Sequence, residues 1–266
     1  MSWFPLRLVK YCKREHNPLH GATHVQLGTL DYYRGLDASF SSVGDSEEAS
    51  YTVGLAPGHT FEMDDHLNER LFGSGMRISG KFTVGGEGRA AATWSVANAF
   101  IYSCYELGSQ ELPSVEAARE VHPEYDSYYC IEHAEEFAQL VLERLTRHTY
   151  ETILADRAWT EIQRTAITQS FQLTIRPVGA RVEYVDGNEL IFDSESVHDA
   201  PHHSELLKLA LFTKLRRYEK QREFRFAWIV ESTFHGPLPV KKDPILIPLQ
   251  PFREVFQSSF ENGLKR

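Results

Sequence analysis

The chain has 266 residues, and its 28 Lys and Arg residues against 37 Asp and Glu residues leave a net charge of -9 at pH 7. Hydrophobic residues make up 42% and charged residues 24%, which is typical of globular proteins rather than disordered ones. The acidic surplus excludes a protein that coats nucleic acid over its whole surface, because phosphate backbones would be repelled.

The hydropathy pattern and the cysteines bear on where in the cell the protein is expected to be. The longest apolar runs, 226–230 and 245–249, are far shorter than a membrane-spanning helix needs, and the first residues lack the apolar region of a secretory signal. Cys12, Cys104 and Cys130 show no C-x-x-C spacing and suit a reducing compartment as packed thiols. The sequence predicts a cytoplasmic protein without a membrane partner.

The first predicted strand covers residues 6–13. Its alternation places Leu8 and Cys12 on one face and Val9 and Tyr11 on the other. The acidic stretch 37–50 that follows is expected to be a loop. Further strands are expected at 81–84, 98–105, 128–131, 172–175, 181–185, 223–230 and 245–249, and the stretch 108–126 is expected to be an exposed connection.

The clearest predicted helix covers residues 134–147. Phe137, Val141 and Leu145 recur on one face, and acidic residues near the start with basic ones at the end suit the helix dipole. A second helix is expected at 205–212. No repeat or low-complexity tract divides the chain, so we expect a single α+β domain over 1–266, with mostly antiparallel, split sheets flanked by a few helices.

Common catalytic signatures are missing from the sequence. It contains no G-x-S-x-G elbow, no phosphate-binding G-x-x-x-x-G-K-[ST] loop and no H-E-x-x-H zinc motif. The histidine-rich stretch 198–203 contains Pro201 and is expected to be a solvated loop rather than a metal site. No metal is predicted.

The most informative segment contains Gln221 and Glu223 at a junction between a polar turn and a strong strand. Their period of two residues predicts that both side chains leave one face of the strand start, while Arg222 leaves the other. A carboxylate placed there can hold a ribose hydroxyl and stabilise positive charge on the sugar as a glycosidic bond breaks. The simpler alternative is that Glu223 pairs with Arg225 on a surface strand.

Three segments together resemble a known layout. They are Leu8-Val9-Lys10-Tyr11 with the following Leu30-Asp31-Tyr32-Tyr33-Arg34, the aromatic strand 98–105, and Gln221-Arg222-Glu223-Phe224-Arg225 near the end. Their order resembles bacterial proteins of the DUF2971 type and the plan of ADP-ribosyltransferases. The acidic loop has Ser46 where proline is usual, and the central strand lacks Ser-Thr-Ser.

The resemblance implies an ADP-ribosyltransferase-like fold and an NAD-dependent ADP-ribosyltransferase, a toxin or phage-defence effector that modifies nucleic acid or protein and is paired with an antitoxin. Glu223 would stabilise the transition state, Gln221 would position the acceptor and Ser103 would orient the nicotinamide ribose. The residues implied to bind NAD, through its pyrophosphate or its rings, are Lys10, Tyr11, Arg34, Tyr33 and Tyr102. The simpler interpretation of these tyrosines, and the one favoured residue by residue, is packing as half-buried strand aromatics.

Two other classes of function stay open. A metal-dependent nuclease would use acidic residues around Mg²⁺, which prefers carboxylate oxygens. The two candidate sets are Asp45, Glu47 and Glu48, or Asp186, Glu189 and Glu223. A non-enzymatic interaction protein would use the abundant aromatic residues, 12% of the chain, at an interface.

Overall fold

The computed structural model describes residues 7–36, 48–73, 76–86, 88, 90–108, 110–168, 173–248 and 256–257. The contacts group the chain into two compact units, each built from segments far apart in the sequence. Unit 1 comprises 1–46, 97–182 and 219–266, and unit 2 comprises 47–96 and 183–218. A single domain was expected over 1–266. The chain crosses between the units at four places, the first of which, 46/47, lies within the acidic stretch 37–50.

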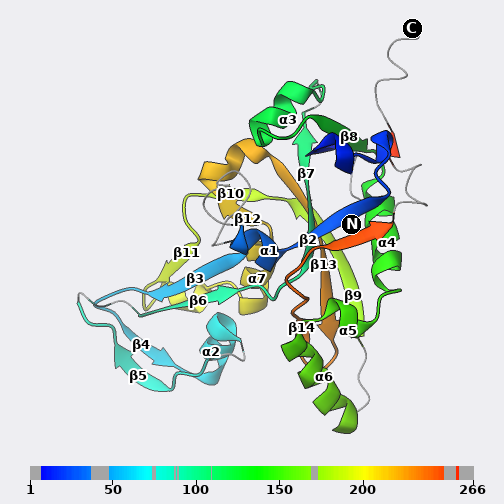
Figure 1. The fold of residues 1–266 in the computed structure, drawn as a ribbon. Coiled ribbons are helices and arrows are strands. Elements are labelled where there is room, and N and C mark those ends of the chain that lie inside the picture. Colours follow the sequence, from blue (N-terminus) through cyan, green and yellow to red (C-terminus); the bar gives the residue numbers. More distant parts are fainter. Residues whose placement is uncertain are drawn as a thin grey trace. The chain divides into compact units, whose positions relative to one another are not determined.

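Unit 1 contains a large antiparallel sheet with the strand order β14-β13-β7-β1-β8-β16 (Figure 1). In addition, β9 pairs with β13, β2 pairs with β7, and β15 pairs with β2. Its strands are β1 (Arg7–Cys12), β2 (His24–Thr29), β7 (Phe100–Leu107), β8 (Ser127–Ile131), β9 (Leu173–Arg181), β13 (Glu223–Ser232), β14 (Gly236–Leu238), β15 (Ile245–Pro248) and β16 (Phe256–Gln257).

Helices surround this sheet. They are the α-helices α1 (Leu30–Gly35), α3 (Val115–Val121), α4 (Ala134–Leu145), α5 (Tyr150–Ile153) and α6 (Asp156–Thr168), with the 3-10 helices η1 (Arg14–His16), η2 (Pro18–His20) and η5 (Arg216–Gln221), the last of which begins in unit 2. The helix α3 lies in the stretch that was expected to be a connection. Ser114 caps its N-terminus by accepting a hydrogen bond from the backbone N–H of Ala117.

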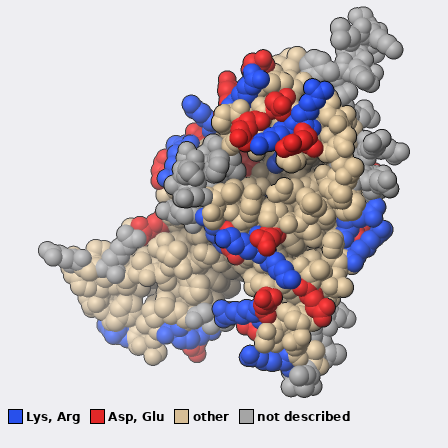
Figure 2. Space-filling view, viewed as in Figure 1, with Lys and Arg blue, Asp and Glu red and all other residues tan. Residues whose placement is uncertain are grey.

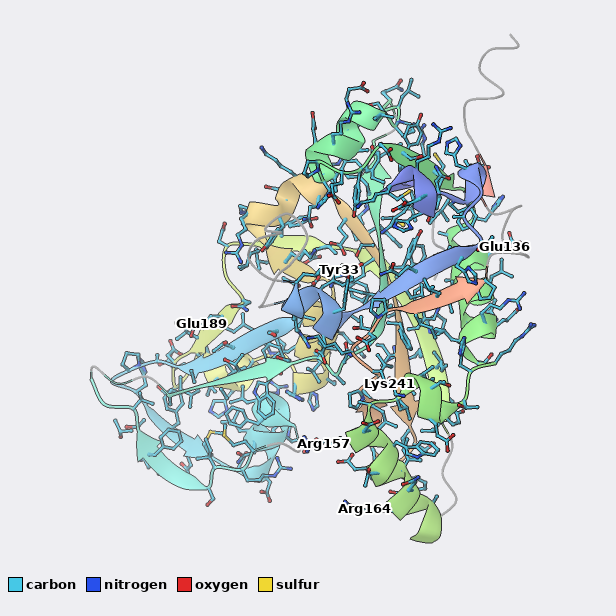
Figure 3. All side chains as sticks on the ribbon, in the orientation of Figure 1. Tyr33, Glu136, Arg157, Arg164, Glu189 and Lys241 are labelled. Carbon is cyan, nitrogen blue, oxygen red and sulfur yellow. The ribbon has the colours of Figure 1, made fainter. Side chains whose placement is uncertain are left out.

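The two faces of the sheet are covered by different helices. On the α4 face, Phe137 of α4 packs on Phe226 and Trp228, while Glu136 points away from the sheet (Figure 3). On the α3 face, Ala118 of α3 packs with Val9 and other hydrophobic residues. The residues of these clusters alternate along β1, with Leu8 and Cys12 on the α4 face and Val9 and Tyr11 on the α3 face, which confirms the predicted faces.

Unit 2 holds three small sheets. Strand β3 lies between β11 and β6, β4 pairs with β5, and β10 pairs with β12. The strands are β3 (Ser50–Leu55), β4 (Thr60–Met63), β5 (Gly80–Thr83), β6 (Ala90–Ser95), β10 (Glu183–Val185), β11 (Glu189–Phe192) and β12 (Thr213–Leu215), and the helices are α2 (Asp65–Phe72), the 3-10 helix η4 (Ser196–Asp199) and α7 (His203–Leu211). The pairs β3–β11 and β10–β12 are parallel.

The predicted class, α+β with mostly antiparallel strands flanked by helices, is confirmed. The predicted strands around 98–105, 128–131 and 223–230 and the helices around 134–147 and 205–212 form with small shifts at their ends. Most of the expected acidic loop, 37–47, lies outside the described residues. Within the described part of the chain, no helix is long and apolar enough to cross a membrane.

Candidate functional site

The strands that carry the predicted site residues are neighbours in one sheet. Strand β7 lies between β13 and β1, and Tyr105 of β7 is opposite both Glu223 of β13 and Val9 of β1. Residues directly opposite each other in an antiparallel pair project from the same face. The opening, middle and last motifs therefore meet in the sheet.

Glu223 belongs to a buried polar cluster on the α3 face. Its Oε1 accepts hydrogen bonds from Ser103 Oγ at 2.6 Å and from Arg225 Nε at 2.8 Å. Glu223 is 5% exposed and Arg225 is fully buried. The pairing of Glu223 with Arg225, the simpler alternative, is therefore present, but in the interior rather than on a surface strand. A buried charge needs such compensation.

The junction before Glu223 differs from the predicted one. Helix η5 ends at Gln221, Arg222 has a φ of 38°, and β13 begins at Glu223. Because Gln221 lies outside the strand, the period of two residues does not relate its side chain to that of Glu223. The guanidinium of Arg222 binds the carboxylate of Glu111 at 2.6 Å and lies 5.3 Å from the ring centre of Tyr105.

The side chain of Lys10 leaves β1 on the opposite face from this cluster. Val9 shares the α3 face with Tyr105 and Glu223, so Lys10, the next residue, projects from the α4 face. Its Nζ donates to the backbone carbonyl of Ser103 at 2.7 Å and lies 4.6 Å from the ring centre of Tyr102.

A fork in the sheet explains why Lys10 reaches this carbonyl. Strand β1 pairs with β7 from Arg7 to Val9, and β2 pairs with β7 at Gly28 and Thr29. The stretch 102–104 of β7 lies between these two pairings. The ammonium of Lys10 thus satisfies a strand carbonyl where the two neighbouring strands have separated.

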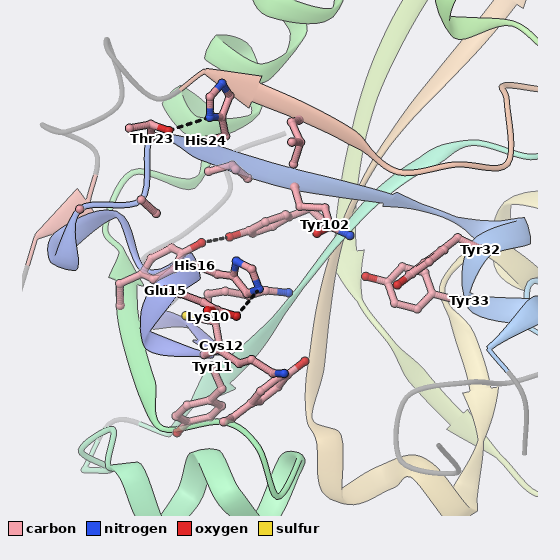
Figure 4. Close-up of a pocket in the computed structure, with 18 of the residues that line it drawn as sticks. Lys10, Tyr11, Cys12, Glu15, His16, Thr23, His24, Tyr32, Tyr33 and Tyr102 are labelled. Atoms are coloured by element: carbon pink, nitrogen blue, oxygen red, sulfur yellow. Dashed lines mark hydrogen bonds and ion pairs between the residues drawn. The ribbon is translucent and has the colours of Figure 1, made fainter. Parts of the chain in front are cut away.

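A pocket of about 600 Å³ lies beside this fork in unit 1 (Figure 4). It is lined by Lys10, Tyr11, Cys12, Lys13, Glu15, His16, residues 21–26, Tyr32, Tyr33, Leu36, Tyr102, Tyr125, Tyr129 and Leu246. The hydroxyls of Tyr102 and Tyr129 are hydrogen-bonded to each other in its wall. The volume falls in the range of small-molecule sites.

The predicted residues thus fall into two groups. Four of those implied to bind NAD line the pocket, namely Lys10, Tyr11, Tyr33 and Tyr102. Ser103 and Glu223 are hydrogen-bonded to each other on the α3 face, and neither belongs to the pocket lining; nor does Gln221. Arg34 is also outside the lining, and its guanidinium binds Asp31 at 2.8 Å.

Several residues of both groups escaped the sequence analysis. Arg225 appeared only as a competing partner of Glu223, and Tyr125 and Tyr129 were not among the predicted site residues. Gly28, which was not among the predicted site residues, leaves room for the ring of Tyr33: a Cβ at Gly28 would lie 2.3 Å from Tyr33 Cε2. Only the fold places Gly28 and Tyr33 in contact.

The buried cysteine thiols and tyrosine hydroxyls near the pocket are protonated at neutral pH. Burial raises the pKa of Cys104 to about 12 and that of Cys12 to about 11. Burial also raises the pKa of the hydroxyls of Tyr102 and Tyr129 well above the ordinary value. The two cysteines are therefore neutral packed thiols, as expected from the sequence, and Lys10 is the charged group on the α4 face of the fork.

The residues of the nuclease alternative are not gathered in the described part of the chain. There, no group of three or more His, Cys, Asp or Glu residues is placed to hold a metal ion. Glu48 lies 3.5 Å from the ammonium of Lys214, and Asp186 binds Arg216 at 2.6 Å. Asp45 and Glu47 lie outside the described residues.

Charged side chains of both signs are interspersed on the face of the molecule seen in Figure 2. Exposed ion pairs contribute to this mixture, among them Arg181 with Glu106 at 2.6 Å. Comparisons of the chain with protein-family models, curated proteins and solved structures gave no match. The resemblance to DUF2971-type proteins and ADP-ribosyltransferases therefore rests on the motifs alone.

Proposed function

We propose that this protein is an NAD-dependent ADP-ribosyltransferase whose reaction centre is Glu223. The observation that supports the proposal is the hydrogen bond of 2.6 Å between Ser103 Oγ and Glu223 Oε1, which joins the central strand to the start of β13. The order β13-β7-β1 provides the strand neighbourhood that the motif layout requires. NAD is the proposed cofactor, and a nucleophilic group of a protein or nucleic acid is the proposed acceptor.

In this reaction the bond between nicotinamide and ribose C1′ breaks, and nicotinamide leaves with the bonding electrons. A nucleophile of the acceptor attacks C1′ and loses a proton. The carboxylate of Glu223 stabilises the positive charge that develops on the ribose, and the hydrogen bonds from Ser103 and Arg225 hold its orientation. Gln221, at the end of η5, is proposed to position the acceptor.

Because Glu223 is buried, this mechanism requires the groups around its carboxylate to move when substrate binds. At 5% exposure, its carboxylate meets a ribose only if the groups around it yield to the substrate. Lys10 projects from the other face, so in this proposal it does not share a ligand with Glu223. Transfer activity is therefore the decisive measurement.

The test is to incubate the full chain with labelled NAD and cell extract, and to measure label transfer and nicotinamide release. Glu223→Gln keeps an oxygen that accepts from Ser103 and Arg225 but removes the charge. We expect this variant to lose activity by at least about a hundredfold, the size of effect typical of electrostatic catalytic groups.

Glu231→Gln is the matched control, because Glu231 lies on the same strand and also binds an arginine, Arg176, at 2.6 Å. It should keep full activity, and the melting temperatures of both variants show whether each is folded. Absence of nicotinamide release by the unaltered protein, or equal activity of the two variants, would refute the proposal.

A further inference from the structure

The ammonium of Lys10 is a partly buried charge that lacks a carboxylate partner among the described residues. Its two contacts are the carbonyl of Ser103 and the ring of Tyr102, which are both neutral. Burial of a cation is costly without a compensating anion. The position is therefore suited to an anionic group of a ligand.

The other charged groups around the pocket are largely paired with each other. Lys13 Nζ binds Glu124 at 2.6 Å, and His16 Nε2 lies 3.6 Å from Glu15. Lys10 is therefore the ammonium of the lining that no described carboxylate pairs with. The anionic group of a ligand would therefore be drawn to Lys10.

The rest of the lining favours an aromatic ring. Tyr32 and Tyr33 extend from α1 toward the space from one side, and Lys10 and Tyr102 lie across from them (Figure 4). Aromatic walls bind planar rings by stacking or edge contacts. Their presence, and a volume of about 600 Å³, indicate a ligand larger than inorganic phosphate.

We propose that this pocket is a mononucleotide-binding site, with the phosphate on Lys10 and the base against Tyr32 and Tyr33. The site is separate from the proposed reaction centre, because neither Glu223 nor Ser103 is part of its lining. The ligand is thus a second small molecule rather than a portion of the NAD held at Glu223.

Calorimetric titration of the full chain with UMP and GMP, in the absence of NAD, tests this proposal. Neither compound is half of NAD, so failure of ADP-ribosyl transfer would not affect the result. We expect at least one of them to bind at least about tenfold more tightly than its nucleoside and than inorganic phosphate, because both the anion and the ring contribute.

Lys10→Met keeps the apolar stem of the side chain and removes the charge. It should weaken nucleotide binding about ten- to a hundredfold, the range expected for loss of a charge-assisted hydrogen bond. Lys208→Met, an exposed lysine of α7 in unit 2, makes the same change in net charge and should leave binding unaltered.

Several outcomes would overturn the proposal. They are no binding of either nucleotide, equal affinity for nucleotide and nucleoside, equal affinity for nucleotide and phosphate, or unchanged binding by a folded Lys10→Met protein. The comparison of nucleotide, nucleoside and phosphate needs only the unaltered chain, so the proposal can still be refuted if the variant fails to fold.

Discussion

Ser103 links the two groups of predicted residues through different atoms. Its hydroxyl donates to Glu223 on the α3 face, and its backbone carbonyl accepts from Lys10 on the α4 side of the strand. A single residue in a central strand can do this because its side chain projects from one face while its carbonyl lies in the plane of the sheet. The two groups are therefore close in the fold, and the two proposals assign them different ligands.

Tyr11 carries a residue-scale prediction. Its hydroxyl is buried with no hydrogen-bond partner in the described part of the chain, and burial raises its pKa to about 12. Leaving a buried polar group unpaired costs about 1–3 kcal/mol, so Tyr11→Phe should leave the free energy of unfolding unchanged or raise it by up to that amount in urea denaturation.

Tyr51→Phe is the matched control for this measurement. The hydroxyl of Tyr51 forms a hydrogen bond of 2.5 Å with His203 Nδ1, so its removal should lower the free energy of unfolding by about 1 kcal/mol. A loss of more than about 1 kcal/mol in Tyr11→Phe would show that its hydroxyl is satisfied in the folded protein.

At the scale of elements, the connection from β2 to α1 sets one wall of the pocket. Thr29 caps α1 by accepting from the backbone N–H of Tyr32, and this fixes where the helix begins. Gly28 lies just before the cap, under the ring of Tyr33. The helix start and the missing Cβ together hold Tyr33 over β2.

Gly28→Ala is the corresponding prediction. The new Cβ would lie 2.3 Å from Tyr33 Cε2, at the far end of the ring, so the ring should swing aside at little cost to stability. Nucleotide binding should weaken severalfold while the melting temperature changes little. Gly187→Ala is the control, because nothing lies within 4 Å of a Cβ there. Equal affinities of the two variants would contradict a role for Tyr33 in the wall.

At the scale of the whole molecule, the chain forms two compact units. Unit 2 holds a neutral histidine, His203, whose pKa is lowered by burial first and by His202 second. His203 Nδ1 shares a hydrogen bond with the hydroxyl of Tyr51, while a hydrogen bond with the backbone of Leu71 opposes the lowering of the pKa. Protonation of the ring would disturb the bond to Tyr51.

This arrangement predicts a pH dependence. Because the pKa of His203 is lower in the folded state than its ordinary 6.5, the unfolded chain takes up the proton first, and stability is lost as pH falls below about 6.5. Hydrogen exchange at pH 7 and pH 5.5 should show unit 2 opening more readily at the lower pH. His203→Gln should reduce this difference, whereas His198→Gln, an exposed histidine, should retain it. An identical pH response in both variants would exclude His203 as its source.

The sequence predicted features that depend on local periodicity. Alternation assigned Leu8 and Val9 to opposite faces of β1, and the helical period identified the buried side of α4. The sequence-based prediction failed where the backbone conformation changes within a few residues. The strand period of two residues was extended to Gln221, but a 3-10 helix and the positive φ of Arg222 precede the strand. The helix α3 was missed because it has only seven residues and buries one of them, Ala118, so it shows no helical period of apolar residues.

The sequence by itself determined the mixed α+β class and the alternation that brings the Glu223 and Arg225 side chains to one face, because both follow from the spacing of apolar and charged residues along a strand. Only the tertiary structure decided that β1 and β2 part along β7, that Lys10 fills the fork beside Tyr102, and that Glu223 is on the other face. Strand register and order depend on packing between segments about a hundred residues apart. No periodic pattern of residues along the sequence encodes which of these segments pack together.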